Sequence, residues 1–170
     1  VDQFNRGASA ISNAADKPLL FRLNLMAGKK AKGSVALASA RAYLERALAL
    51  APAGAWKEQY QDFLELSLAL AECEYLDGNF ERADQLADQI LANARSGRDS
   101  ARVHLLRISL YQVAGRLDEA VASMIEALRL FGIGLPDSAR EIEAATDAEV
   151  DAVSALLQGR RIADIADAPR

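Results

Sequence analysis

Cysteine, histidine and threonine each occur once in the 170 residues, and proline occurs only four times. A single cysteine, Cys73, cannot form an internal disulfide. Cys73 and His104 together cannot supply the four protein ligands of a tetrahedral zinc site. We therefore expect no structural metal, no cofactor and, by default, the reducing cytoplasm as the compartment.

Residues that favour β-strands are also scarce. The chain has 7 Val, 8 Ile and 1 Thr, and aromatic residues make up 6% of it, whereas it has 35 Ala and 24 Leu. Ala and Leu are strong helix formers, while strands prefer branched and aromatic side chains. The composition therefore predicts an all-α fold.

Charge and hydropathy exclude two further classes of partner. The net charge is −4 and the isoelectric point is near 5.1, so the chain as a whole does not attract nucleic acid. No run of about 18 apolar residues could cross a bilayer, and no basic segment followed by an apolar run resembles a signal peptide. We expect neither nucleic-acid nor membrane binding.

Turn residues and apolar stripes at three- and four-residue spacing divide the chain into helices. Asp16 with Pro18 and Ser34 are expected N-caps, and Ser138 with Glu141 matches a capping box. No linker divides the chain, so we expect a single domain over residues 1–170. The predicted helices cover residues 2–13, 17–32, 35–50, 55–76, 80–95, 100–113, 117–131 and 139–158, with a possible restart at Thr146.

Three helix pairs align when Ala40, Ala83 and Ala120 are used as anchors. Before the last two stand the strings 78–83 (Gly-Asn-Phe-Glu-Arg-Ala) and 115–120 (Gly-Arg-Leu-Asp-Glu-Ala). These strings resemble the turn and second-helix start of a tetratricopeptide repeat. The first unit lacks the turn glycine, and the anchors lie 43 and 37 residues apart where the standard repeat has about 34. We predict a right-handed solenoid of antiparallel helix pairs with irregular repeats; the alternative is a nonrepeating helical bundle.

A second resemblance covers nearly the whole chain. Five segments are similar to the helical region of large bacterial multidomain signalling kinases: 24–32, Trp56 with Tyr60, 72–80, 130–136 and 159–162. In that family a serine/threonine-kinase-like domain and an AAA-type ATPase precede this region, and GAF and histidine-kinase domains often follow it. The resemblance implies a regulatory or interaction segment without catalytic residues of its own.

The expected function is therefore protein interaction or signal relay, with no enzymatic activity. First helices of such a solenoid line a concave groove for a peptide or a neighbouring domain, including flanking domains of the same protein. Repeat spacing places six residues on that lining: Leu68, Glu72, Tyr75, Leu105, Ser109 and Gln112.

Two other functions stay open. The chain could be a rigid spacer or oligomerisation element, with self-association through the terminal stripes of Phe4 and Ile11 and of Ile162 and Ile165. A small-ligand sensor is the other alternative, based on a cluster of Trp56, Tyr60 and Phe63.

Several residues that suggest chemistry have simpler interpretations. Residues 27–34 contain lysines and glycines in the wrong order for a phosphate loop. They are expected to form a solvated basic helix end, and a site for an acidic partner tail is the alternative. His104 and Cys73 are expected to be packing residues rather than a base and a nucleophile. Glu72, Glu74 and Asp77 lack the spacing of a calcium loop and are expected to be an ordinary helix-end cluster.

Overall fold

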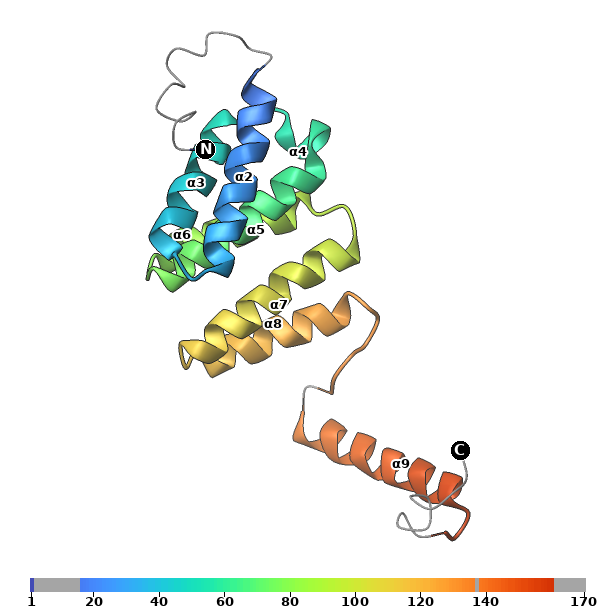
Figure 1. Ribbon diagram of the computed structural model, residues 1–170. Helices are drawn as coiled ribbons and strands as arrows, with labels where there is room; N and C mark the ends of the chain where they lie inside the picture. Colours follow the sequence, from blue (N-terminus) through green and yellow to red (C-terminus); the bar gives the residue numbers. More distant parts are fainter. Residues whose placement is uncertain (2–15, 137, 161–170) are drawn as a thin grey trace. The chain divides into compact units, whose positions relative to one another are not determined.

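The computed structural model describes residues 1, 16–136 and 138–160, and the described chain is helical with no strand. It packs as two units, residues 1–132 and 133–170, which are treated separately below (Figure 1). The sequence had indicated a single domain. The predicted helix over residues 2–13 and the terminal stripes, Phe4 with Ile11 and Ile162 with Ile165, lie outside the described residues.

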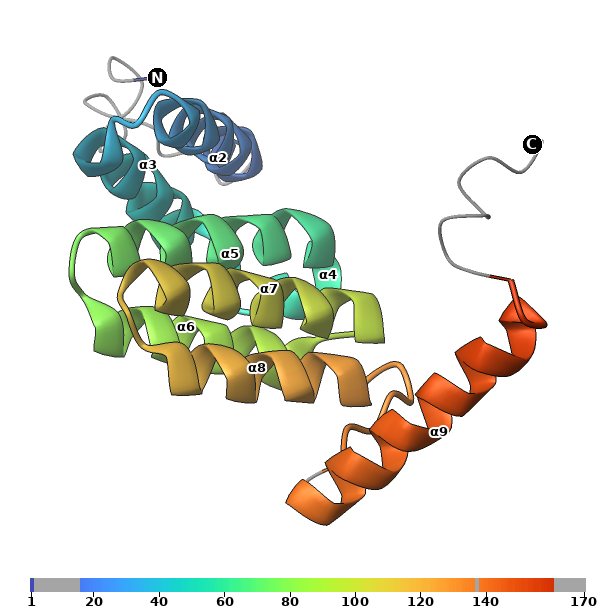
Figure 2. The same cartoon turned by 90° about the horizontal axis from the view of Figure 1, so that it is seen from below.

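The described residues of the first unit form three helix pairs and one short helix. Short turns join the members of each pair, so the paired helices run antiparallel and pack along their lengths. Figure 2 shows α5 and α7, the first helices of successive pairs, side by side. The helices are α2 (Lys17–Gly33), α3 (Leu37–Leu50), α4 (Ala55–Glu58), α5 (Tyr60–Leu76), α6 (Phe80–Asn93), α7 (Gly97–Val113) and α8 (Leu117–Arg129).

The same type of backbone turn joins the two helices of each of the three pairs. Gly78 and Gly115 have φ of 87° and 72°, and Val35 has φ of 59° at the equivalent place between α2 and α3. In each turn the following amide donates to a carbonyl five residues earlier: Ala36 to Ala31 (3.0 Å), Asn79 to Glu74 (2.8 Å) and Arg116 to Tyr111 (2.8 Å). These bonds satisfy carbonyls at the end of the first helix. The turn therefore repeats even where the sequence lacks glycine.

Val35 is the strained member of this set. A β-branched residue rarely adopts positive φ, and an L-residue there costs about 1–2 kcal/mol. Val35 is exposed, so its side chain contributes little packing. We predict that Val35→Gly stabilises the protein by about 1 kcal/mol, after the entropy cost of glycine, as a higher thermal midpoint.

Two variants control this prediction. Val35→Ala keeps the Cβ and should gain less, whereas Gly78→Ala introduces the same strain into the second pair and should destabilise. A lower midpoint for Val35→Gly would show that the turn does not store strain.

The anchor alanines Ala40, Ala83 and Ala120 are all buried. Ala40 packs with Phe21, Leu44 and Leu70 in the largest core cluster. In the last two pairs, Ala83 and Ala120 share a cluster with Tyr75, Leu110 and Tyr111. Small side chains at these points let neighbouring helices approach closely.

At Gly28, α2 lies close against α3. A Cβ built at Gly28 would lie 2.6 Å from Cγ of Leu44, a fully buried side chain. Overpacking costs about 1–3 kcal/mol, while alanine in a helix gains about 1 kcal/mol over glycine. We predict that Gly28→Ala lowers the free energy of unfolding by up to about 2 kcal/mol, measured by urea denaturation.

Gly33→Ala is the matched control. It lies on the same helix, and a Cβ there would meet no atom within 4 Å. It should be neutral or stabilising. An equal response of the two variants would mean that α2 and α3 are not in close contact at Gly28.

Helix starts differ from the prediction at three places. The predicted 55–76 helix breaks at Gln59, whose φ of −130° separates α4 from α5. Asp16 is the N-cap residue of α2 with Pro18 in the first turn, as predicted, although its side chain makes no cap hydrogen bond. The predicted N-cap at Ser34 is wrong, because α3 begins after Ala36. The helix α7 begins earlier than predicted, at Gly97, because Ser96 caps it.

The second unit contains α9 (Ala139–Leu157). Its predicted capping box is confirmed, since Ser138 accepts from the Glu141 amide and Glu141 from the Ser138 amide. The helix runs through Thr146 without a restart. It has no buried residue, and its larger apolar side chains, Ile142, Val150, Val153 and Leu156, are exposed.

Candidate functional site

The first helices of the three pairs border one hollow of about 280 Å³, here called the first-helix hollow. The helix α2 contributes to it from the first pair, α5 from the second and α7 from the third. Its lining combines apolar and charged side chains: Leu68, Ala69, Leu105 and Leu106 with Lys29, Lys32, Glu65, Glu72 and Arg102.

Three predicted site residues meet in this hollow. Leu68 and Glu72 are one turn apart on α5, and Leu105 faces them from α7. Leu105 is 61% exposed, which is high for a leucine that lines a hollow. The structure therefore brings together half of the predicted lining.

The other three predicted residues do not line the hollow. Tyr75 is buried, with ring centroids 4.7 Å from Phe80 and 6.1 Å from Tyr111. Ser109 and Gln112 are exposed farther along α7, and the Ser109 hydroxyl donates to the carbonyl of Leu105 at 3.0 Å. A partner contact at these positions stays a prediction.

Sequence reasoning missed the charged side of the hollow. Glu65 and Arg102 lie three residues before Leu68 and Leu105, at equivalent positions of the second and third pairs. Extending the predicted stripe by one turn toward the N-terminus of each first helix would have found both residues. Lys29 and Lys32 had been interpreted as a solvated helix end, with a site for an acidic partner tail as the alternative.

Ion pairs cross the hollow between successive pairs. Glu65 accepts from Lys29 Nζ at 2.8 Å and also from Arg102, while Lys32 pairs with Glu72. Burial acts to raise the pKa of Glu65, but the hydrogen bonds from Lys29 and Arg102 prevail and lower it below its ordinary value. Glu65 therefore stays ionised and holds a cation from each neighbouring helix.

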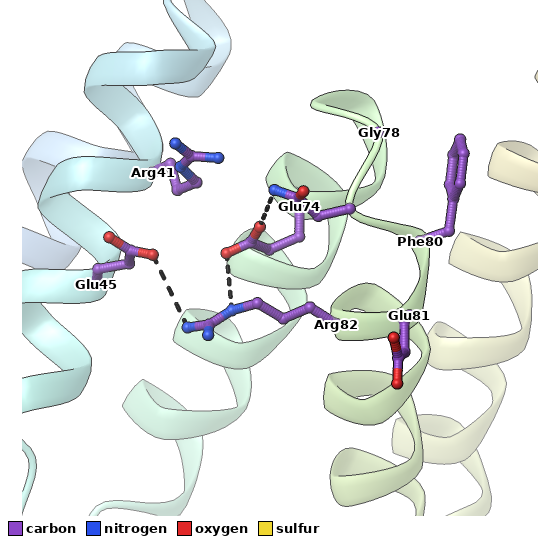
Figure 3. A pocket seen from close by; sticks show the side chains of 8 residues that line it. Arg41, Glu45, Glu74, Gly78, Phe80, Glu81 and Arg82 are labelled. Atoms are coloured by element: carbon purple, nitrogen blue, oxygen red, sulfur yellow. Dashed lines mark hydrogen bonds and ion pairs between the residues drawn. The ribbon is translucent and has the colours of Figure 1, made fainter.

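A second hollow, of about 610 Å³, lies where α3, α5 and α6 meet (Figure 3). Glu74 is only 1% exposed and accepts from Asn79 Nδ2 at 2.8 Å. Arg82 lies 2.9 Å from Glu74 and 3.8 Å from Glu45 on α3. This network joins the first pair to the second through a buried carboxylate.

Removal of Arg82 tests how much this ion pair contributes to the stability of the protein. We predict that Arg82→Ala destabilises the protein by about 1–3 kcal/mol, because the buried Glu74 carboxylate loses its cationic partner. Chemical denaturation at neutral pH measures this change.

The surface pair of Arg22 with Asp62, at 3.3 Å, provides the control. Arg22→Ala should cost less than about 1 kcal/mol, because both groups are solvated. If Arg82→Ala costs no more than Arg22→Ala, the Glu74 network does not stabilise the contact between pairs.

The aromatic cluster proposed for ligand sensing is present, but its polar groups are engaged. Trp56 and Phe63 pack edge to face at 4.9 Å. The Tyr60 hydroxyl donates to Asp99 at 2.9 Å and accepts from the Arg95 amide at 3.0 Å. The Arg95 guanidinium stacks 4.2 Å from the Tyr60 ring centroid. These contacts fasten the start of α5 to the segment between α6 and α7.

Cys73 and His104 lie in packed surroundings. Burial raises the pKa of the Cys73 thiol, which disfavours its reactive thiolate. Burial also lowers the pKa of His104, and nearby Arg107 acts in the same direction. Both residues therefore favour their neutral forms.

The acidic cluster is divided among separate cations. Glu72 pairs with Lys32, Glu74 with Arg82 and Asp77 with Arg41. Among the described residues, no group of three or more His, Cys, Asp or Glu side chains is placed to hold a metal ion.

Within the same described ranges, no helix combines the length and the apolar character needed to span a membrane.

The described residues of the first unit form paired helices that border a mixed apolar and charged hollow. A comparison with curated proteins indicates a signal-transduction kinase context for the chain. The chain is 28% identical, over 144 residues, to part of hybrid signal transduction histidine kinase G of Dictyostelium discoideum. The match covers 79% of this chain and 4% of that kinase. The signalling context predicted from the sequence is thus supported, although this relative is not bacterial. No family model and no solved structure matches the chain.

Proposed function

We propose that the first unit is a tetratricopeptide-like right-handed solenoid that serves as a non-catalytic interaction or relay module of a cytoplasmic signalling kinase. Three identical turns, three antiparallel pairs and three buried anchor alanines support the repeat. The similarity to a histidine kinase segment supports the context. Since His104 and Cys73 are engaged in packing, we assign catalysis to other parts of the longer protein.

The first-helix hollow carries this proposal. It joins three successive first helices, so one bound segment would contact all three pairs. Leu68 and Leu105 offer apolar surface, and the flanking charges offer specificity. A partner in this hollow would bridge the pairs, which suits a relay between neighbouring domains.

Overlapping peptides that tile the whole kinase containing this chain provide the test. Binding to the full chain is measured by fluorescence anisotropy. We predict that at least one peptide binds and that Leu105→Glu weakens it at least tenfold, because a carboxylate would be introduced into the apolar part of the hollow.

Leu19→Glu is a matched control, since Leu19 on α2 is 60% exposed and does not line the hollow. It should leave binding unchanged. The absence of any bound peptide, or equal loss in both variants, would contradict the assignment of this hollow as the binding site.

A spacer or oligomerisation element is the second candidate, favoured by an apolar stripe on α8. Leu117, Val121 and Met124 recur at four- and three-residue spacing and are all exposed. Light scattering distinguishes the candidates: a dimer that Val121→Glu dissociates, in a chain that binds no peptide, would favour the spacer.

A further inference from the structure

The charges around the first-helix hollow point to the chemistry of its occupant. Its lining has three cations, Lys29, Lys32 and Arg102, and two anions, Glu65 and Glu72. Glu65 is shared between Lys29 and Arg102, so two cations have one carboxylate between them. The hollow is locally positive in a chain whose net charge is −4.

These cations can donate hydrogen bonds to a second carboxylate without releasing Glu65. An ammonium has three N–H donors and a guanidinium has five. Lys29 contacts Glu65 through one nitrogen, and Arg102 contacts it through Nη2, so further donors remain on both groups. Their side chains are 49% and 38% exposed, so these donors face solvent.

The apolar part of the hollow lies beside these cations. Leu105 and Leu68 come from neighbouring helices, and Leu106 and Ala69 complete the apolar lining. Leu105 is mostly exposed in the unbound chain, so covering it would remove apolar surface from water. An occupant with only charged side chains would leave this surface uncovered.

We propose that the first-helix hollow binds an acidic protein segment in which a leucine-sized apolar side chain is flanked by Asp or Glu. The apolar side chain covers Leu105 and Leu68, and the carboxylates accept hydrogen bonds from Lys29 and Arg102. This inference rests on the proposed function and adds the chemistry of the partner.

Four labelled peptides of equal length test the proposal by fluorescence anisotropy with the full chain. One contains leucines flanked by glutamates, the second has glutamine for each glutamate, the third has alanine for each leucine, and the fourth has lysine for each glutamate. We expect the first to bind at least tenfold more tightly than the others. Its binding should weaken with added salt, because the cations are partly exposed.

Variants of the chain locate the binding. Arg102→Gln and Lys29→Gln should each weaken the acidic peptide at least fivefold. Arg129→Gln should leave it unchanged, because Arg129 lies on α8 and pairs with Glu126. Circular dichroism verifies the fold of each variant, and if one glutamine variant fails to fold, the other decides the result.

The outcomes separate this inference from the proposed function. Equal binding of the glutamine peptide, preference for the lysine peptide, or no effect of both glutamine variants would overturn the acidic partner. If a tiled kinase peptide that is not acidic still depends on Leu105, the interaction function stands and only the acidic chemistry fails. If neither the tiled peptides nor the four designed ones bind, both proposals fail.

Discussion

The reversal of the chain after each first helix is the constraint on which the rest of the first unit depends. One residue with positive φ and one hydrogen bond to a carbonyl five residues earlier turn α2 into α3, α5 into α6 and α7 into α8. The buried alanines Ala40, Ala83 and Ala120 each follow the positive-φ residue of their turn by five residues and pack against the preceding helices. Helices of 13 to 17 residues are marginal alone, so this pairing also supplies most of their stability.

The same repetition builds the hollow. Each first helix occupies the same place in its pair, so equivalent positions of successive first helices face the same hollow. Leu68 and Leu105 are one such set, and Glu65 and Arg102 are another. The side chains differ in charge while the backbone repeats. A regular backbone with irregular side chains thus produces one mixed site that no single pair contains.

The sequence predicted the helical class, two of the three turns and three of the nine residues that line the hollow. It could not show that Val35 adopts the glycine conformation, because local sterics disfavour it and only the packing of α2 on α3 requires it. The break at Gln59 was missed because the apolar stripe continues through it. Burial of Tyr75 depends on Phe80 and Tyr111, which lie in later elements and leave no mark in the spacing of α5.

The central helix α5 uses its acidic residues on two faces with different consequences. Glu74 is buried and joins the second pair to α3 through Arg82, so its contribution is to stability. Glu65 and Glu72 are partly exposed and hold cations of α2 and α7. A carboxylate that arrives in the hollow accepts hydrogen bonds from the remaining donors of Lys29 and Arg102, and it leaves both the Glu65 contacts and the Glu74 network in place. Occupancy of the hollow therefore acts on contacts between pairs, while the turns and buried alanines keep each pair intact.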